Sequence, residues 1–250
     1  MGEKEKAIAL GHPSYVWREG QQRRLDLVRR YVPLQGARIL DAGCGLGLYM
    51  SRFHAFSDQV YGVDVDAEKV AEARHAASGA LVAGVDALPF AARSFDVVFS
   101  HEVLEHVQDD ATAVHEAYRV LQPGGYLVIF GPNRWYPFET HGIYWRGRYH
   151  FGNIPLVNYL PDRWRARLCP HVRAYRRREL LSLLDGLAGQ VVVQRVIYPG
   201  YDNIVARWPL IGKWLRRMTY ALEKTWLQRF GLSHLIIFRK AGNTHEVQSV

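Results

Sequence analysis

The sequence predicts an α/β fold in which helices flank a doubly wound, mostly parallel sheet of seven strands. Apolar runs of strand length alternate with amphipathic stretches of helical period through the first half of the chain. Runs such as FDVVFS at Phe95–Ser100 are continuous and rich in β-branched and aromatic residues, as in parallel strands buried on both faces. The stretch ILDAGCGLGLYM at Ile39–Met50 begins as such a run and continues into a glycine-rich loop. In a sheet of this kind the ligand crevice lies at the carboxyl ends of the strands.

The individual elements follow from local patterns. Leu25, Val28 and Tyr31 share one side of the first helix. Asp66 can cap the helix that follows it, and the Pro-Gly-Gly stretch at 123–125 ends another. The expected helices are Gln21–Tyr31, Leu46–Phe56, Ala67–Ala77, Glu102–Leu121 and Arg178–Leu187. The expected strands are Ala37–Asp41, Val60–Val63, Ala80–Ala83, Phe95–Ser100, Tyr126–Phe130, Gln190–Tyr198 and Leu235–Arg239.

The composition indicates a soluble globular protein. An apolar content of 48% with 22% charged residues supports a packed core and excludes a disordered chain. No apolar run approaches the roughly 18 residues that a membrane-spanning helix needs. The first residues contain no apolar segment of secretory length, so we expect a cytoplasmic location. Cys44 and Cys169 have no metal-ligand or disulfide spacing, so we expect two reduced thiols.

The net charge of +8 is concentrated between residues 134 and 178. The basic residues there include Arg134, Arg146, Arg148, Arg163, Arg165, Arg167, Arg173, Arg176, Arg177 and Arg178. Such a cluster can bind nucleic acid, an anionic lipid surface or a phosphorylated substrate, and it can equally be a solvated face.

The glycine-rich loop indicates a bound cofactor. A loop that leaves a parallel strand and opens a helix points backbone N–H groups at its ligand, and glycines let the backbone approach that ligand closely. The dinucleotide fingerprint Gly-x-Gly-x-x-Gly fails, because Leu48 and Met50 stand where the third glycine is needed. The Gly-Lys-Ser/Thr ending of a phosphate-binding P-loop is absent as well.

Four motifs in order resemble those of the class I S-adenosylmethionine-dependent methyltransferases, in particular the small-molecule type 11 group. They are DAGCGLG after the first strand, Asp64 at the end of VYGVD, Asp86-Ala87 after the third strand, and FDVVFSHEVLEHV followed by RVLQPGGYLVIF. The resemblance is close over Ile39–Phe130 and holds only in outline over Leu180–Arg239. It implies a Rossmann-like sheet, S-adenosylmethionine as the cofactor and S-adenosylhomocysteine as the product. A dinucleotide-binding protein is the alternative.

The resemblance also assigns cofactor contacts. Three loop glycines close on the methionine portion, Asp41 orients the loop and the ammonium end, and Asp64 holds the ribose. Val65 packs beside the adenine, Asp86 accepts from the exocyclic amine, and the Ala87 N–H reaches a ring nitrogen. The predicted cofactor-binding set is Asp41, Gly43, Cys44, Gly45, Gly47, Asp64, Val65, Asp86, Ala87 and Ser100. The alternative for each of the three aspartates is a purely structural role, as a helix cap or a turn residue.

The chain divides into four segments within one compact domain. Residues 1–36 form an N-terminal helical segment or lid, and residues 37–131 form the cofactor-binding half of the sheet domain. Residues 132–177 form an irregular, aromatic and arginine-rich insertion that serves as a cap. Residues 178–250 complete the sheet and carry an amphipathic helical insertion at 202–232.

Methyl transfer from a sulfonium is an in-line displacement, so positioning supplies much of the acceleration. A base is needed only for a weakly acidic acceptor. His101, at the end of the fourth strand, and His141, after the fifth, are the predicted catalytic residues. Glu102 and His106, one expected helical turn apart, are interpreted as a structural hydrogen bond, and no metal site is predicted.

The acceptor is expected to be a small molecule, with lipid-linked and glycan-related compounds as candidates. The Asn/Asp-Pro-Pro-aromatic tetrad of base amino-methylating enzymes is absent, since Ser100-His101-Glu102-Val103 stands there. The Pro-Cys nucleophile of cytosine-carbon methylation is absent too, so nucleic acid is disfavoured. A catalytically idle cofactor-binding partner subunit and an RNA-directed methyltransferase that uses the arginine cluster stay open as alternatives.

An amphipathic stretch at Leu210–Phe230 carries tryptophans on its apolar side and basic residues opposite. This composition suits an interfacial membrane helix, a cap over an apolar substrate or a dimer surface. The sequence leaves the oligomeric state open.

Overall fold

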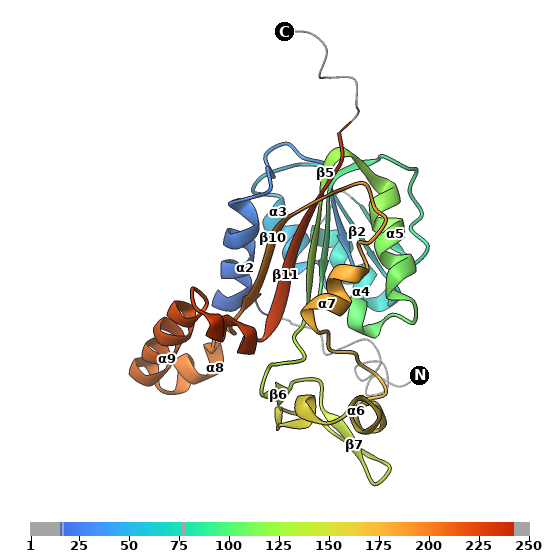
Figure 1. Cartoon of the computed structure of the whole chain (residues 1–250). Helices are drawn as coiled ribbons and strands as arrows, with labels where there is room; N and C mark the ends of the chain where they lie inside the picture. Colours follow the sequence, from blue (N-terminus) through green and yellow to red (C-terminus); the bar gives the residue numbers. More distant parts are fainter. Residues whose placement is uncertain (1–15, 17, 77–78, 243–250) are drawn as a thin grey trace.

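A seven-stranded sheet forms the centre of the molecule, as predicted (Figure 1). The structure, a computed structural model, describes residues 16, 18–76 and 79–242, so residues 1–15 and 17 of the predicted lid at 1–36 lie outside the described residues. The strand order is β10-β11-β5-β4-β1-β2-β3. The pairs of β1 to β5 are parallel, and β11 runs antiparallel to both of its neighbours. The strands are β1 Ile39–Ala42, β2 Val60–Asp64, β3 Gly79–Val82, β4 Phe95–His101, β5 Leu121–Pro132, β10 Gly189–Ile197 and β11 Ser233–Lys240.

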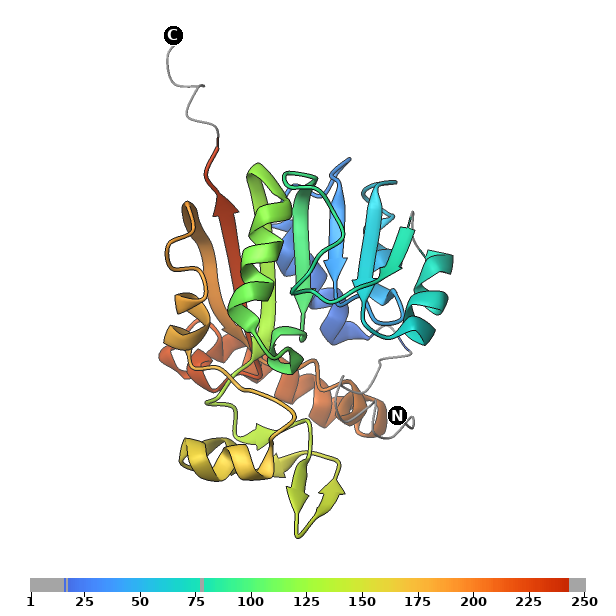
Figure 2. The same cartoon turned by 90° about the vertical axis from the view of Figure 1, so that its right-hand side faces the viewer.

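Helices cover both faces of the sheet (Figures 1 and 2). On one face α2 (Glu19–Arg29), α3 (Leu48–Phe53) and α4 (Ala67–Ala73) share a buried apolar cluster with the strands. On the other face α5 (Asp110–Val120) and α7 (Arg177–Ser182) pack on a second cluster. Because both faces are covered, the carboxyl ends of the parallel strands are left as the place where a ligand can enter.

The helix expected at Glu102–Leu121 begins eight residues later than predicted, at Asp110. Glu102 has a φ of 56°, a left-handed conformation that an α-helix cannot contain. A short 3₁₀ turn, η2 (Leu104–His106), follows it. Asp109 then caps α5 through a 2.9 Å hydrogen bond from the Thr112 N–H. The segment between β4 and α5 is therefore an irregular loop at the ligand edge of the sheet.

Residues 133–175 form a small lobe below the carboxyl ends of the strands (Figures 1 and 2). The strands β6 (Phe138–Glu139) and β9 (Ile154–Pro155) pair with each other, as do β7 (Ile143–Trp145) and β8 (Arg148–His150). The helix α6 (Asp162–Leu168) completes the lobe, with the 3₁₀ turn η3 (Val157–Tyr159) before it. The predicted irregular insertion thus has a defined structure of short elements.

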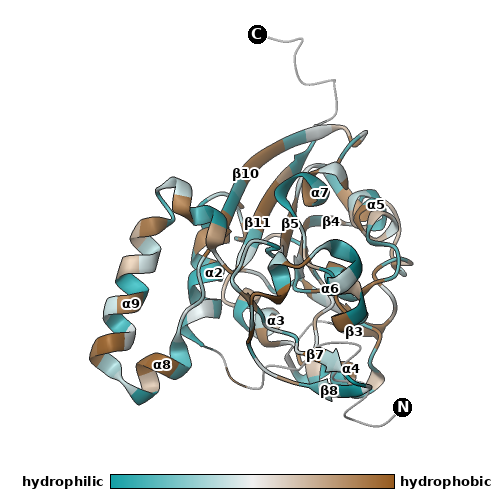
Figure 3. Ribbon diagram, turned by 60° about the horizontal axis from the view of Figure 1, so that its bottom comes forward, coloured by the Kyte–Doolittle hydropathy of each residue, from teal (hydrophilic) through white to brown (hydrophobic). Residues whose placement is uncertain are grey.

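The second insertion forms a helix pair at the edge of the molecule (Figure 3). It consists of α8 (Asp202–Arg207) and α9 (Pro209–Leu222), followed by η4 (Trp226–Phe230). The apolar side chains of α9 point outward: Leu210 is 85% exposed and Trp214 is 64% exposed. Among the described residues, no helix has the length and apolar character required to cross a bilayer.

Candidate functional site

A cavity of about 570 Å³ lies at the carboxyl ends of β1, β2 and β4. One part of its lining comes from the glycine loop and from the ends of β2 and β3. The other part comes from the loop after β4 and from the lobe. The predicted site residues among its lining are Asp41, Gly43, Cys44, Gly45, Asp64, Val65, Asp86, His101 and His141. The residues that sequence reasoning did not assign include Gln21, Lys69, Glu102, Val103, His106, Gln108 and Thr140.

The glycine loop adopts the conformation that its sequence predicts. Gly43 has a φ of 86°, and a Cβ built there would lie 2.3 Å from Val103 Cγ2. Gly45 has a φ of 53°, and a Cβ there would meet no atom within 4 Å. Gly43 is therefore required by close packing against the loop after β4, whereas Gly45 leaves bare backbone facing open space. A ligand tail resting on this backbone fits the geometry.

Asp64 is held at the end of β2 by two backbone groups. Its Oδ2 accepts from the Gly45 N–H at 2.9 Å, and its Oδ1 accepts from the Asp66 N–H at 2.9 Å. Each carboxylate oxygen can accept a further hydrogen bond, and the side chain lines the cavity. This placement fits the recognition of the two hydroxyls of a ribose.

Val65 and Asp86 form the wall next to Asp64. Val65 is 52% exposed, an unusual exposure for a valine that lines a cavity. A Cβ on Gly84 would lie 2.3 Å from Asp86 Oδ1, so the glycine makes room for this carboxylate. An apolar surface beside an acidic acceptor fits an aromatic base that carries an amino group.

Gly47, Ala87 and Ser100 are not among the residues that line the cavity. Gly47 is the N-cap of α3 and packs near Ala73. The Ala87 N–H donates to the Gly84 carbonyl at 3.2 Å, so a turn already uses the group that was expected to reach the base. Ser100 is buried within β4.

Asp41 and Cys44 have strongly shifted pKa values. Burial, followed by the charge of Asp64, raises the pKa of Asp41 to about 8. Burial and the nearby carboxylates raise the pKa of the Cys44 thiol well above its usual range. A cationic group such as an ammonium would favour the ionised form of Asp41, whereas Cys44 stays a neutral thiol.

His101 is enclosed by aromatic rings, which disfavours it as a base. Its ring centroid lies 4.9 Å from that of Tyr49 and 5.2 Å from that of Phe130. Burial, followed by the charge of Arg24, lowers the pKa of His101 to about 3. The imidazole is therefore neutral and weakly basic, although it does line the cavity.

His141 is oriented by a chain of charged partners. Its Nδ1 lies 3.1 Å from Glu139 Oε1, and Arg165 Nη2 donates to Glu139 Oε2 at 2.5 Å. Burial alone would raise the pKa of Glu139, but the hydrogen bonds from His141 and the charge of Arg165 outweigh it and lower the pKa to about 2. In a neutral His141, an ionised Glu139 favours the tautomer that has its proton on Nδ1 and its lone pair on Nε2.

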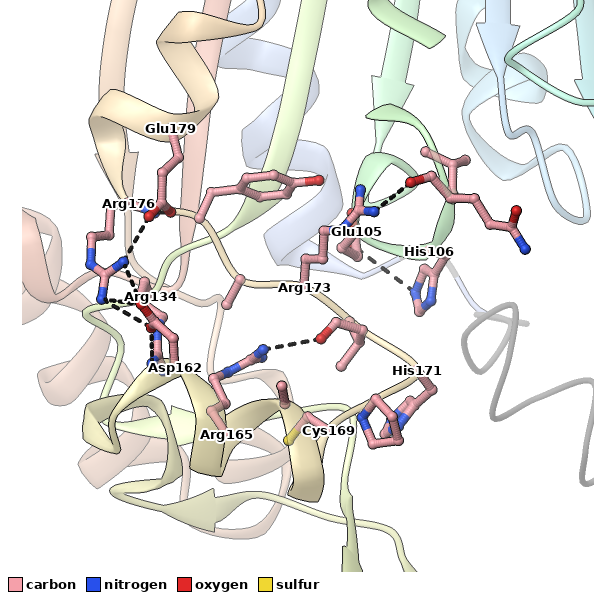
Figure 4. A pocket seen from close by; sticks show the side chains of 17 residues that line it. Glu105, His106, Arg134, Asp162, Arg165, Cys169, His171, Arg173, Arg176 and Glu179 are labelled. Atoms are coloured by element: carbon pink, nitrogen blue, oxygen red, sulfur yellow. Dashed lines mark hydrogen bonds and ion pairs between the residues drawn. The ribbon is translucent and has the colours of Figure 1, made fainter. Parts of the chain in front are cut away.

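Two further groups next to His141 were missed as site residues. Glu105 Oε1 lies 4.0 Å from His106 Nε2 (Figure 4) and 4.0 Å from His141 Nε2. The predicted hydrogen bond between Glu102 and His106 is wrong, because Glu102 accepts from Ser233 Oγ at 2.6 Å instead. The motif EVLEHV was interpreted with a helical period, and the irregular loop invalidates that period.

Part of the arginine cluster lines a second cavity of about 660 Å³, between the lobe and the sheet domain (Figure 4); these residues are Arg134, Arg165, Arg173 and Arg176. Arg134 and Arg165 are buried. Arg134 pairs with Asp162 at 2.9 Å, and Arg176 pairs with Glu179 at 2.7 Å. The other arginines of the cluster are exposed, so the ion pairs neutralise only part of the predicted basic surface; they are Arg146, Arg148, Arg163, Arg167, Arg177 and Arg178.

The sheet order, the glycine loop and the three carboxylates define a class of protein, the enzymes that bind S-adenosylmethionine at the carboxyl edge of a Rossmann-like sheet. Residues 40–129 match the family described as a methyltransferase domain. A malonyl-[acyl-carrier protein] O-methyltransferase of Enterobacter lignolyticus is 32% identical over 199 residues, which are 78% of this chain and 71% of that protein. This chain belongs to the class I S-adenosylmethionine-dependent methyltransferases, in their type 11 group.

Two further matches agree with this assignment. A ubiquinone biosynthesis O-methyltransferase of Xylella fastidiosa is 38% identical over 118 residues, which are 44% of this chain and 48% of that protein. An S-adenosylmethionine-dependent methyltransferase of Mesorhizobium loti has the same fold, with a TM-score of 0.60 at 22% identity over 86% of this chain and 96% of that chain. The predictions of a methyltransferase and of S-adenosylmethionine as cofactor are confirmed, and the dinucleotide alternative is wrong.

Proposed function

We propose that this enzyme transfers the methyl group of S-adenosylmethionine to an oxygen atom of a small-molecule acceptor. The observation that carries the proposal is one cavity that joins Asp64 and Asp86 to His101, Glu102 and His141. The first pair suits a nucleoside, and the second group leaves polar side chains for an acceptor. Two similar enzymes are named as O-methyltransferases, which favours oxygen over nitrogen or carbon.

Some of these residues would hold the cofactor, and others would position or activate the acceptor. S-Adenosylmethionine supplies an activated methyl group on a sulfonium. Asp64, Asp86 and the bare backbone of the glycine loop would hold it, with Asp41 facing its ammonium end. The loop after β4 and the lobe would place the acceptor oxygen in line with the carbon–sulfur bond. Of the two predicted bases, His141 is the better candidate, because Glu139 orients it whereas aromatic rings enclose His101.

A labelled-methyl assay tests the acceptor class. We would incubate the protein with methyl-labelled S-adenosylmethionine and separate panels of phenols, catechols, carboxylic acids, amines and transfer RNA, with Asp64→Asn as the inactive control. The proposal predicts label in oxygen acceptors only. Label confined to amines or RNA would contradict it, and an RNA product would revive the RNA-directed alternative.

We also propose that α9 places the enzyme on an anionic membrane surface, where a lipid-linked acceptor would be available. Leu210, Ile211, Trp214 and Met218 form an exposed apolar stripe, with exposed fractions of 85%, 60%, 64% and 39%. Lys213 and Arg217 are exposed on the adjoining face of α9, and Lys224 is exposed just after its end. No described residue of α8 or α9 lines the cofactor cavity, which speaks against a cap over the substrate. An apolar stripe with a cationic border favours lipid headgroups over a second copy of the chain.

Vesicle binding tests this placement. The protein should sediment with vesicles containing phosphatidylglycerol, less with pure phosphatidylcholine, and less again as salt rises. Trp214→Ser should weaken sedimentation, whereas Trp145→Ser, which changes a tryptophan that is 54% exposed in the lobe, should not. Dimers that dissociate on Trp214→Ser, without vesicle binding, would instead assign the stripe to a second copy.

A further inference from the structure

Three side chains from two separate segments converge beside the cofactor cavity. Glu105 and His106 come from η2 after β4, and His141 comes from the lobe. One ligand atom of each side chain, a carboxylate oxygen or an imidazole nitrogen, lies within 4.8 Å of the others. Donor atoms around one zinc-like ion lie about 3–3.5 Å apart, given bonds of about 2.0–2.2 Å. A contraction of about one ångström would bring the three donors to one ion.

Glu105 is the most informative member, because its carboxyl group is fully buried and faces the two imidazoles, each 4.0 Å away. The side chain has no solvent exposure. Neither carboxylate oxygen has a hydrogen-bond partner among the described residues. Burying a carboxylate without hydrogen bonds costs several kcal/mol unless the group is protonated, paired with a cation or bound to a metal. Such a group, aimed at two imidazoles, points to a ligand.

The hydrogen bonds of the lobe prepare His141 to donate a lone pair to such a ligand. His141 Nδ1 lies 3.1 Å from Glu139, which Arg165 holds, and His141 Nε2 lies on the side of Glu105. A metal-binding histidine in proteins commonly donates its second ring N–H to a carboxylate, which fixes both the tautomer and the ring orientation. Glu139 and Arg165 therefore have the arrangement expected of groups that support a metal ligand.

The surrounding charge favours a cation as well. Glu102 adds a further negative charge next to Glu105. The φ of 56° at Glu102 is a strained conformation for a non-glycine residue, and such strain concentrates at functional sites. Two neighbouring carboxylates in a buried position repel each other unless a proton or a cation lies between them.

We propose that Glu105, His106 and His141 bind one divalent transition-metal ion at the acceptor end of the cofactor cavity. Two imidazoles and a carboxylate suit ions such as Zn²⁺, Fe²⁺, Co²⁺ or Mn²⁺ rather than Ca²⁺. Three protein ligands leave positions open toward the cavity, where an acceptor hydroxyl can approach.

This proposal deepens the proposed function and rests on it for the role of the ion. With the ion bound, His141 serves as a ligand in place of the base role given above, because the ion itself would lower the pKa of the acceptor hydroxyl. The hydroxyl proton leaves to solvent, and the acceptor oxygen forms a bond to the methyl carbon as the carbon–sulfur bond breaks. The electron pair of that bond stays on sulfur, which becomes a neutral thioether. The substrate class is therefore an oxygen acceptor that can itself bind a metal ion.

A titration with Co²⁺ tests the site without an activity assay. We would strip the full-length protein with a chelator, add S-adenosylhomocysteine and follow the visible absorption of bound Co²⁺, with Zn²⁺ as competitor. One Co²⁺ should bind per chain. His141→Ala and Glu105→Gln should each weaken binding at least about tenfold. The matched control His115→Ala changes an exposed histidine on α5 and should bind Co²⁺ as the unchanged protein does.

The stability of the metal-free protein is a second measurement of the role of Glu105. Glu105→Gln should leave the metal-free protein about as stable as before, because it replaces a buried carboxyl group with an amide of nearly the same shape. The proposal is overturned if no saturable Co²⁺ spectrum appears, if His115→Ala loses as much affinity as His141→Ala, or if Glu105→Gln destabilises the metal-free protein. If the metal proposal is overturned in this way but the protein still binds S-adenosylhomocysteine, the proposed function is unaffected.

Discussion

Asp64 shows how one side chain can serve the fold and the ligand together. Its carboxylate accepts from the Gly45 and Asp66 N–H groups, which fixes the glycine loop against the start of α4. The remaining lone pairs face the cavity, where they would accept from ribose hydroxyls. The sequence position alone, at the end of a predicted strand, indicated this role.

Asp64→Asn should weaken S-adenosylhomocysteine binding about ten- to a hundredfold, because hydrogen bonds to a charged group contribute about 1.5–3 kcal/mol. Isothermal titration calorimetry measures the change. Asp185→Asn, at an exposed position outside the cavity, is the matched control and should bind normally. Equal affinity of the Asp64→Asn variant would remove Asp64 from the binding site.

Asp41 should make the stability of the ligand-free protein depend on pH. The unfolded chain loses this proton near 3.8, the ordinary pKa of an aspartate, and the folded chain loses it near 8. Between these values the folded state binds more protons, so the free energy of unfolding falls as pH rises. Chemical denaturation at several pH values should show this fall in the unchanged protein and a flatter profile in Asp41→Asn. Parallel profiles of the two proteins would contradict the raised pKa.

At the scale of elements, the loops determine the geometry of the site more than the helices do. The strand runs were correctly predicted, because continuous β-branched and aromatic segments suit a sheet buried on both faces. The segment after β4 was predicted as helix, because EVLEHV has helical spacing. The left-handed Glu102 and the Asp109 cap override that propensity. Local patterns cannot show such an override, since it depends on contacts such as the one between Glu102 and Ser233.

Gly43→Ala should displace the glycine loop from the loop after β4. The new methyl group would lie 2.3 Å from Val103 Cγ2, and the φ of 86° disfavours alanine in addition. We expect a loss of about 1–3 kcal/mol in stability, measured by thermal or urea unfolding, together with weaker cofactor binding.

The double variant Gly43→Ala/Val103→Ala separates the two causes. It removes the clash but keeps the unfavourable φ, so it should recover part of the stability lost in Gly43→Ala. No loss at all in the single variant would show that the two loops are not packed as described.

At the scale of the whole molecule, the contacts of two buried arginines hold the segments of the lobe together. Arg165 contacts Glu139, Asn158 and the Val172 carbonyl, and Arg134 contacts Asp162 and two carbonyl groups. The family motifs predicted the cofactor half of the site, since those residues are close in sequence. In the acceptor half, Glu105, His141 and Arg165 come from distant parts of the sequence. Their spacing in the sequence therefore could not predict that they lie close together.

Arg165→Met should destabilise the protein by about 3–5 kcal/mol, because it leaves Glu139 charged and buried without its partner. Urea unfolding measures this loss. The pKa of Glu139 is lowered to about 2, so the stabilisation it provides is present above 4.5, the ordinary pKa of a glutamate, and is lost as pH falls through 2. A smaller effect of Arg165→Met at pH 3 than at pH 7 is therefore expected. An equal effect at both pH values would contradict the role of the ionised pair.

The account as a whole depends on a sulfonium nucleoside bound across the ends of β1, β2 and β3. Calorimetric titration of the unchanged protein with S-adenosylhomocysteine tests this most directly. We predict saturable binding of one molecule per chain, which Asp64→Asn weakens. A titration that gives no heat with S-adenosylmethionine or S-adenosylhomocysteine, while NAD binds, would contradict the account.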